Sequence, residues 1–171
     1  MTRIAVTDAC IFIDIHELNL TPTLFSLPLD IHTTLDVYNE LLDDHKQFLT
    51  AFISVNKLTI HTLSGEERIA LHKGIFPRSL SENDKTVIFL ATKLSATVLS
   101  SDKSVRNYAK KLAIEYHGML WIFDQLVLQN VITKEDSAQK LNELITGNTI
   151  YQNNKELMTE VYKRIRQWTK A

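Results

Sequence analysis

The stretch LSENDKTVIFLATKLSATVLSSDKSVRNYAKKLA, residues 80–113, decides the fold of this chain. It begins with Ser81-Glu82-Asn83-Asp84, a helix-capping box in which Asp takes the place of the usual Glu or Gln. Apolar residues at helical spacing follow, and the buried-strand sequence Ala96-Thr97-Val98-Leu99-Ser100 then ends at Ser101-Asp102. A second amphipathic helix comes next. We therefore expect a helix–strand–helix unit, which is typical of a parallel α/β sheet.

Short apolar strands alternate with helices in the N-terminal half as well. The pattern predicts strands at residues 3–7, 29–32 and 58–61 and helices at residues 9–18, 35–42 and 66–72. Thr33 or Thr34 is expected to cap the second of these helices. From Met119 the pattern is helical to the end of the chain. The fold class is therefore α/β, with a central, mostly parallel sheet flanked by helices.

The chain is expected to form one folded unit with a C-terminal extension. We find no linker, internal repeat or low-complexity run. Residues 1–150 carry the main domain, and residues 151–171 form a basic amphipathic helix. Its apolar stripe predicts packing on the same domain, with binding of a partner protein, a second subunit or RNA as the alternative. The stripe consists of Leu157, Val161, Ile165 and Trp168.

The composition excludes several protein classes. The 171 residues are 44% hydrophobic and 23% charged, as in an ordinary globular domain, which excludes a disordered chain. Only 4 Gly and 3 Pro occur, which argues against glycine-rich phosphate loops and turn-rich all-β folds. No apolar run approaches the roughly 20 residues that span a bilayer. Asp8 comes too early for a signal peptide and Cys10 is the single cysteine, so we expect a cytoplasmic protein without disulfides.

The charges are divided unevenly along the chain. Residues 1–85 hold 7 Lys and Arg against 12 Asp and Glu, whereas residues 86–171 hold 12 against 8. The net charge of the whole chain is only −1. Such a separation suits an acidic metal pocket beside a basic surface that holds a phosphodiester. The alternative is that the two biases average out in space.

Four acidic residues occur where a parallel α/β fold gathers its ligands. Asp8 and Asp102 each follow a strand and precede a helix, and the carboxyl ends of parallel strands meet at one edge of the sheet. Asp84 lies in the first turn of its helix, and Glu40 lies on the helix expected after the second strand. Together they would form an oxygen-rich site for Mg²⁺ or Mn²⁺. Taken singly, each has a simpler explanation as a helix cap or a surface residue.

Other kinds of active site lack their sequence signatures. The six histidines show no HExxH or HxH spacing, and Cys10 has no partner at ligand spacing, which argues against zinc. Neither a GxSxG nucleophile motif nor a phosphate-binding glycine loop occurs. Cys10 lies within an apolar run, so we expect a buried thiol rather than a nucleophile.

Four acidic segments, taken in order, resemble the motifs of the PIN-domain family, in particular its VapC-like toxin ribonucleases. They are Thr7-Asp8-Ala9-Cys10-Ile11-Phe12-Ile13, Val37-Tyr38-Asn39-Glu40-Leu41, Leu80-Ser81-Glu82-Asn83-Asp84 and Val98-Leu99-Ser100-Ser101-Asp102-Lys103. Gly118-Met119-Leu120-Trp121-Ile122 resembles the glycine-led segment that follows the last acid in many bacterial members. The likeness covers residues 3–145. At Cys10 the family often has Asn or Ser, and this chain is longer than the compact toxins.

The resemblance implies a PIN-like three-layer fold and a metal-dependent ribonuclease that hydrolyses RNA phosphodiester bonds. By position, the catalytic acids would be Asp8, Glu40, Asp84 and Asp102. All of these except Glu40 would be ligands of Mg²⁺ or Mn²⁺. Ser100 would supply the supporting hydroxyl near the last acid.

The resemblance also implies partners. These are an RNA substrate and, for a toxin of a bacterial toxin–antitoxin pair, a small antitoxin protein, with the enzyme itself a homodimer away from the membrane. Lys85, Lys103 and Arg106 lie close to the acids in the sequence and are candidates for contacts with the RNA backbone, or else ordinary solvated residues. Two other functions stay open. One is a non-toxin PIN nuclease of RNA processing, and the other is a catalytically silent PIN-like binding module.

Overall fold

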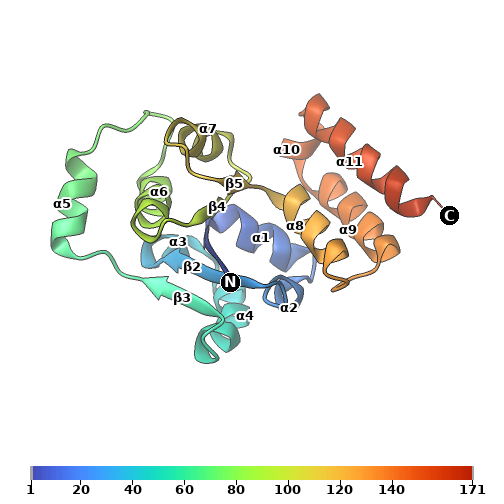
Figure 1. Cartoon of the computed structure of the whole chain (residues 1–171), viewed down its shortest axis with the longest axis horizontal. Coiled ribbons are helices and arrows are strands. Elements are labelled where there is room, and N and C mark those ends of the chain that lie inside the picture. The colour runs from blue at the N-terminus through green and yellow to red at the C-terminus, as the bar shows by residue number, and fades with distance from the viewer. Residues whose placement is uncertain (1, 171) are drawn as a thin grey trace.

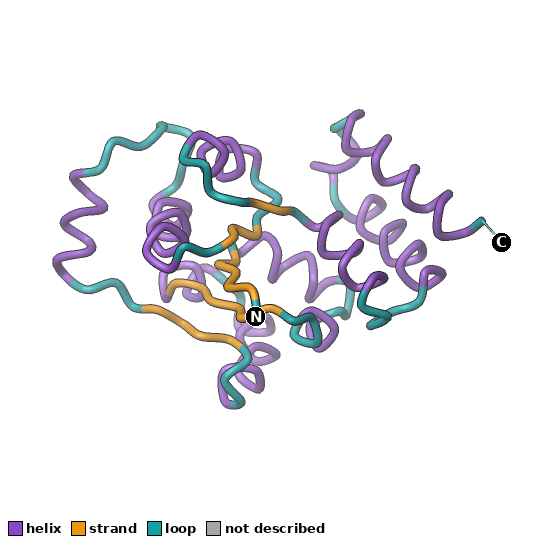
Figure 2. The backbone as a smooth tube through the Cα atoms, viewed as in Figure 1, coloured by secondary structure: helices purple, strands orange, loops and turns teal. Residues whose placement is uncertain are grey.

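The computed structural model describes residues 2–170. Met1 of the predicted domain (residues 1–150) and Ala171 of the predicted C-terminal helix (residues 151–171) therefore lie outside the described residues. At the centre is a parallel sheet of five strands in the order β3-β2-β1-β4-β5 (Figures 1 and 2). The strands are β1 (Arg3–Thr7), β2 (Leu29–Thr34), β3 (Leu58–His61), β4 (Thr97–Leu99) and β5 (Tyr116–His117). The predicted α/β class, with a parallel sheet flanked by helices, is confirmed.

Helices connect the strands and continue to the C-terminal end. Up to β4 they are α1 (Ala9–Glu17), α2 (Thr21–Leu24), α3 (Leu35–Glu40), α4 (Asp43–Ser54), α5 (Gly65–Lys73) and α6 (Glu82–Leu94). After β4 they are α7 (Lys103–Lys111), α8 (Met119–Leu128), α9 (Lys134–Gly147), α10 (Thr149–Gln152) and α11 (Lys155–Thr169). The sequence did not predict α4 or β5. Helix α4 has only a short buried stripe, formed by His45 and Leu49, and β5 is two residues long.

Two helix caps follow the local sequence signals. Ser81 and Asp84 form the predicted capping box at the start of α6: the Ser81 hydroxyl accepts the Asp84 N–H, and the Asp84 carboxylate accepts the Ser81 N–H. Of the two threonines predicted before α3, Thr34 is the cap, and its hydroxyl accepts the N–H of Val37 at 3.2 Å. These caps fix where the helices that carry two of the four acids begin.

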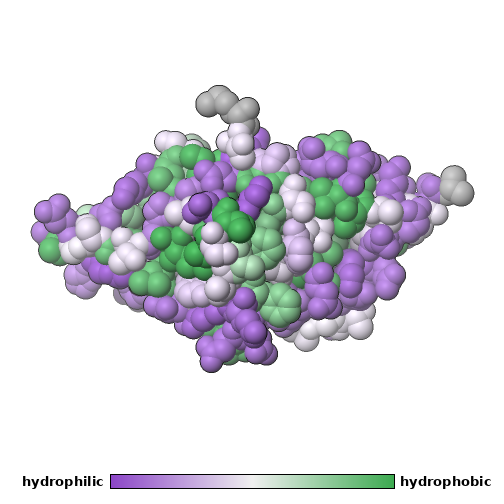
Figure 3. All heavy atoms as spheres, turned by 90° about the horizontal axis from the view of Figure 1, so that it is seen from below, coloured by the Kyte–Doolittle hydropathy of each residue, from purple (hydrophilic) through white to green (hydrophobic). Residues whose placement is uncertain are grey.

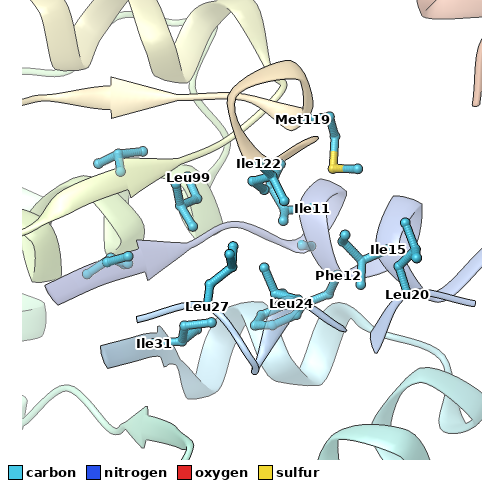
Figure 4. Packing of buried hydrophobic residues seen from close by; sticks show 14 of the residues in the cluster. Ile11, Phe12, Ile15, Leu20, Leu24, Leu27, Ile31, Leu99, Met119 and Ile122 are labelled. Atoms are coloured by element: carbon cyan, nitrogen blue, oxygen red, sulfur yellow. The ribbon is translucent and has the colours of Figure 1, made fainter. Parts of the chain in front are cut away.

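The register of the sheet assigns its two faces to different helices. Ile31 of β2 and Leu99 of β4 pair with residues of β1 two positions apart and therefore share a face. On that face they pack with apolar residues of α1, α2 and α8 (Figure 4). Thr34 points to the opposite face, where its hydroxyl is hydrogen-bonded at 2.8 Å to the hydroxyl of Thr86 in α6. The sheet is thus the middle of three layers.

The C-terminal helices α8–α11 gather on one side of the molecule, and α5 lies on the opposite side (Figure 1). Helix α11 packs against α9 and α10. As its apolar stripe predicts, Val161 and Trp168 are buried, and the other two stripe residues are partly buried against the core. Arg164 donates to both carboxylate oxygens of Asp124 at 2.8 Å, which ties α11 to α8.

Val161→Ala is expected to lower the free energy of unfolding by about 2 kcal/mol, because two methyl groups leave a fully buried site. Since α11 packs on the domain, the loss should appear as one shifted transition, followed by circular dichroism and tryptophan fluorescence. Tyr162→Ala, at an exposed position of the same helix, is the matched control and should shift the transition much less. A separate early transition in Val161→Ala would contradict the single unit.

The surface mixes polar and apolar side chains. Figure 3 shows one face, on which hydrophobic residues gather toward the middle and hydrophilic residues toward both ends. Several large apolar side chains in different parts of the chain are exposed, among them Phe48, Ile75, Leu128 and Ile150. Within residues 2–170, no helix combines the length and the apolar character needed to cross a membrane.

Candidate active site

The carboxyl ends of β1 and β4 bring Asp8 and Ser100 together. The two strands are neighbours in the sheet, and the N–H of Asp8 donates to the Leu99 carbonyl at 3.0 Å. The Ser100 hydroxyl donates to Asp8 Oδ2 at 2.7 Å, and the backbone N–H of Asp102 donates to that hydroxyl at 3.1 Å. Ser100 is fully buried. Its hydroxyl therefore links the two acids that follow the strands.

Asp8 is a buried carboxyl group with a raised pKa. Removal from water raises the pKa of Asp8 to about 6, and the negative charge of Asp84 adds to the rise. Hydrogen bonds from Ser100, Cys10 and the N–H of Ala9 act in the opposite direction. Among residues 2–170, no cationic side chain forms an ion pair with Asp8. A buried carboxylate of this kind is stabilised by a bound cation.

Cys10 supports the same carboxylate with a sulfur atom. Its thiol donates to Asp8 Oδ2 at 3.4 Å, and its Sγ accepts the N–H of Ser101 at 3.2 Å. Burial, together with the charge of Asp8, raises the pKa of the Cys10 thiol above its ordinary value, so the thiol stays protonated. Cys10 is therefore a hydrogen-bonding neighbour of Asp8 and not a nucleophile.

Asp84 and Glu40 are brought near each other through Asn83. Asp84 Oδ2 accepts the N–H of Ser81 at 2.7 Å in the capping box. The Asn83 side-chain amide donates to Glu40 Oε2 at 2.8 Å, which connects the end of α3 to the start of α6. Glu40 itself is exposed. The two predicted acids of this pair thus lie at adjoining helix ends, and the charge of Asp84 reaches Asp8.

Asp102 caps α7 and remains exposed. Its Oδ1 accepts the N–H of Ser104 at 2.7 Å and that of Val105 at 3.0 Å, as expected of a helix cap. Within residues 2–170, its Oδ2 makes no hydrogen bond, and the same holds for Oδ1 of Asp84. Each of these two acids therefore keeps one oxygen available to a ligand while the other holds a helix end.

The donor chemistry of this edge fits a hard divalent cation. The donors are carboxylate and hydroxyl oxygens, which Mg²⁺ and Mn²⁺ prefer, apart from the protonated thiol of Cys10. Across the described residues, no three Asp, Glu, His or Cys side chains lie close enough together to hold a metal ion as they stand. A cation shared by Asp8, Asp84 and Asp102 would therefore require their free oxygens to move closer together.

The three predicted basic residues have different surroundings. Lys85 forms an ion pair with Glu82, and its Nζ lies 5.7 Å from the centre of the Phe76 ring. Lys103 is exposed. Arg106 is partly buried, and its Nε has no hydrogen-bond partner among residues 2–170. Lys103 and Arg106 therefore present more of their charge to a ligand than Lys85 does.

Sequence reasoning singled out Cys10 only as a departure from the family next to Asp8, and it did not foresee Asn83 or Tyr151 at the site. Cys10 and Asn83 are hydrogen-bond partners of two of the acids. Each lies within two residues of a predicted acid, and that proximity was a usable signal. Tyr151 instead reaches Ser101 across 50 positions of sequence, with 3.4 Å between its hydroxyl and Ser101 Oγ. No local pattern predicts such a contact.

One comparison with known proteins identifies the family of this chain. A family model, DUF3368, described as a PIN domain, matches residues 4–167. No curated protein matches the chain. Among solved structures, the chain is similar to a PilT N-terminus domain protein from the hyperthermophilic archaeon Sulfolobus solfataricus P2, with a TM-score of 0.48 and 18% sequence identity. That similarity covers 72% of this chain and 93% of the other.

Proposed function

Because the chain belongs to the PIN-domain family, generally a fold of metal-dependent nucleases, we propose that this protein is an endoribonuclease that hydrolyses RNA phosphodiester bonds with Mg²⁺ or Mn²⁺. One observation carries the proposal. Asp8 is a buried carboxyl without a cationic partner in residues 2–170; it is joined to Asp102 through Ser100 and lies within reach of the charge of Asp84. Such a group of acids is suited to a divalent cation.

The four acids have distinct roles in this proposal. Asp8 and Asp102 would hold the cation directly, Asp84 would hold it directly or through a water, and Glu40 would hold it or assist deprotonation of the water. Ser100 holds the Asp8 carboxylate in place by its hydrogen bond. When bound, the cation lowers the pKa of the attacking water and offsets the charge of the phosphodiester. The expected products carry a 5′-phosphate and a 3′-hydroxyl.

Basic residues on α7 hold the RNA backbone in this proposal. Lys103 follows Asp102 directly, and Arg106 lies one helical turn further on. Both side chains are close to the acids in the sequence, and neither forms an ion pair with residues 2–170. The charge of Lys85 is balanced by Glu82, so we assign it a smaller contribution.

For the biological role, we propose a cytoplasmic toxin of a toxin–antitoxin pair that acts as a homodimer and is inhibited by a small antitoxin protein. A non-toxin PIN nuclease of RNA processing would have the same chemistry. A catalytically silent binding module is disfavoured because all four acids are present. A short neighbouring reading frame whose purified product stops cleavage would distinguish the toxin from the RNA-processing enzyme.

Calorimetric titration of Mn²⁺ tests the proposed site. The wild-type protein is expected to bind Mn²⁺, and Asp102→Asn is expected to lose the binding heat because it removes one charged ligand. Asparagine is also a good N-cap residue, so α7 should remain intact. Asp136→Asn, which removes the same charge from the exposed first turn of α9, is the matched control and should bind Mn²⁺ like the wild type.

Two results would contradict the proposal. If Asp102→Asn bound Mn²⁺ and cleaved RNA at the wild-type rate, the assignment of Asp102 would be wrong. If the wild-type protein neither bound Mn²⁺ nor cleaved RNA, the binding module would replace the nuclease as the favoured function.

A further inference from the structure

A small pocket lies where the nuclease core meets the C-terminal helices. Its volume is about 90 Å³. The core contributes Ser101 after β4, Arg106 of α7 and Gly118 before α8. The C-terminal part contributes Tyr151 of α10 and Leu157 of α11, and the remaining lining residues are the apolar Met119, Leu120 and Ile150. The pocket therefore exists only because the chain continues past the region of the acidic motifs and folds back on it.

The charge in this pocket is an arginine without a partner. Arg106 Nε is buried and makes no hydrogen bond within residues 2–170. By contrast, Arg68 and Arg164 each pair with a carboxylate, at 3.0 Å and 2.8 Å. A buried donor left unpaired costs about 1–3 kcal/mol, and more when it is charged. This cost is removed if an anionic ligand accepts the hydrogen bond.

Two hydroxyl groups lie beside this guanidinium. Tyr151 is buried, and its hydroxyl lies 3.4 Å from Ser101 Oγ, a long contact that leaves both groups free to donate to a better acceptor. No carboxylate lines the pocket within the described chain. One guanidinium and two hydroxyls, without an acid, form a donor set for a tetrahedral oxyanion.

Gly118 keeps the pocket open. Its φ is −115°, a value that any residue adopts, so the backbone conformation does not require glycine here. A Cβ at this position would be in ordinary contact with the Ser100 carbonyl oxygen at 3.5 Å, Arg106 Nη1 at 3.8 Å and Ser101 Oγ at 3.9 Å. A side chain would therefore fill the space in front of these two donors. The absence of one leaves room for a ligand.

The pocket lies next to the proposed catalytic edge. Ser101 stands between Ser100, which bonds Asp8, and Asp102. Its backbone N–H donates to Cys10 Sγ, so the strand end that holds Asp8 also forms the pocket wall. We infer that the pocket binds one phosphate group of the RNA strand, next to the phosphodiester that the acids cleave. This inference rests on the proposed ribonuclease function for the identity of the strand.

The test is binding of a fluorescein-labelled single-stranded RNA of mixed sequence, measured by fluorescence anisotropy in EDTA so that no cleavage occurs. Arg106→Gln is expected to weaken binding about tenfold at low salt. It should also reduce the slope of log K against log salt by about 0.7, the value for one lost phosphate contact with a single strand. Lys110→Gln removes the same charge from the exposed side of α7 and should change neither quantity.

Two further variants separate a contact from a folding defect. Arg106→Lys keeps the charge and should retain most of the salt slope while it loses affinity, because lysine lacks the planar donor pair. Tyr151→Phe removes one hydroxyl and should weaken binding by a smaller factor without any change in the slope. Thermal unfolding of each variant confirms that the fold is present. Wild-type affinity and slope in Arg106→Gln, or no RNA binding by the wild-type protein, would overturn the inference.

Competition identifies the ligand. Inorganic phosphate at millimolar concentration and constant ionic strength should weaken RNA binding by the wild-type protein by up to the same tenfold and have no effect on Arg106→Gln. If phosphate binding depended on Arg106 but RNA binding did not, the pocket would hold a free phosphate instead of the strand. If polyglutamate displaced the RNA through Arg106 and phosphate did not, the ligand would be a carboxylate of a partner protein. Either result would overturn the RNA assignment.

The outcome is separable from that of the proposed function. With Mn²⁺, Arg106→Gln should raise KM and leave kcat little changed, because the pocket binds the substrate without touching the reacting atoms. RNA that is bound through Arg106 but never cleaved by the wild-type protein would refute the nuclease and keep the pocket. Cleavage and binding that are both indifferent to Arg106→Gln would refute the pocket and keep the nuclease.

Discussion

Asp8→Asn is expected to slow RNA cleavage about a thousandfold while it makes the protein more stable at neutral pH. Asparagine has nearly the shape of aspartate: its oxygen can accept the Ala9 N–H while its NH2 group donates to the Ser100 hydroxyl, but it supplies no charge to a cation. The loss of a direct ligand removes several kcal/mol from the stabilisation of the transition state. Stability rises because a buried group that is costly to ionise becomes neutral. Single-turnover cleavage and thermal unfolding of the same samples measure both effects.

Asp14→Asn is the matched control for this variant. Asp14 lies on α1, and burial raises its pKa to about 6, as for Asp8. Its carboxylate accepts the side-chain amide of Asn148 at 3.3 Å. The control should therefore gain stability at neutral pH and keep its cleavage rate. If Asp8→Asn cleaved RNA at the wild-type rate, Asp8 would not belong to the proposed site. If both variants lost cleavage, the loss would come from a change in the folded structure and not from a missing metal ligand.

Without divalent cations, Asp8 alone is expected to lower the free energy of unfolding by about 3 kcal/mol between about pH 4 and about pH 6. Its pKa is 3.8 as a solvated group and about 6 in the folded protein. Between these two pH values the folded state holds more protons than the unfolded state, so the free energy of unfolding falls as the pH rises. Above about pH 6 the contribution of Asp8 no longer changes with pH. Glu67 and Glu115 change stability in the opposite direction, because their pKa values are lowered in the folded protein by hydrogen bonds from Lys93 and His117.

The measurement is therefore the difference in unfolding free energy between Asp8→Asn and the wild type at each pH, from urea titrations in EDTA. The difference should be close to zero at about pH 4 and should rise to about 3 kcal/mol at neutral pH. Mn²⁺ should reduce it, since a ligand stabilises only the protein that binds it. The corresponding difference for Asp14→Asn should be unaffected by Mn²⁺. A difference that does not vary with pH would contradict the buried, titrating carboxyl.

Local sequence signals predicted much of the fold correctly. The capping box at Ser81 and Asp84 sets the start of α6, and the run of apolar residues before Ser100 marks β4. These signals work because helix caps and strand burial depend on residues within a few positions of one another. Helix α4 was missed because its buried stripe is short. Strand β5 was missed because two residues are too few to show the alternation of a strand.

Contacts between distant segments did not follow from local patterns. His32 and His61 are 29 positions apart and show no ligand spacing, yet their ring nitrogens lie 2.8 Å apart across β2 and β3. Histidine spacing along the chain therefore gave no sign of this pair. Spacing along the chain reports neighbours on one helix or strand, whereas strand order brings the others together.

The sequence by itself determined most of the helices and strands of this protein, and the positions of Asp8 and Asp102 after strands and of Asp84 at a helix start, because periodicity and capping are local. Only the tertiary structure decided that β1 lies beside β4, which places Asp8 against Ser100 over 92 positions of sequence. It likewise decided that Tyr151 closes a pocket around Arg106. The physical reason is that strand order and helix docking are chosen by burying all apolar faces at once, and no single segment contains that information.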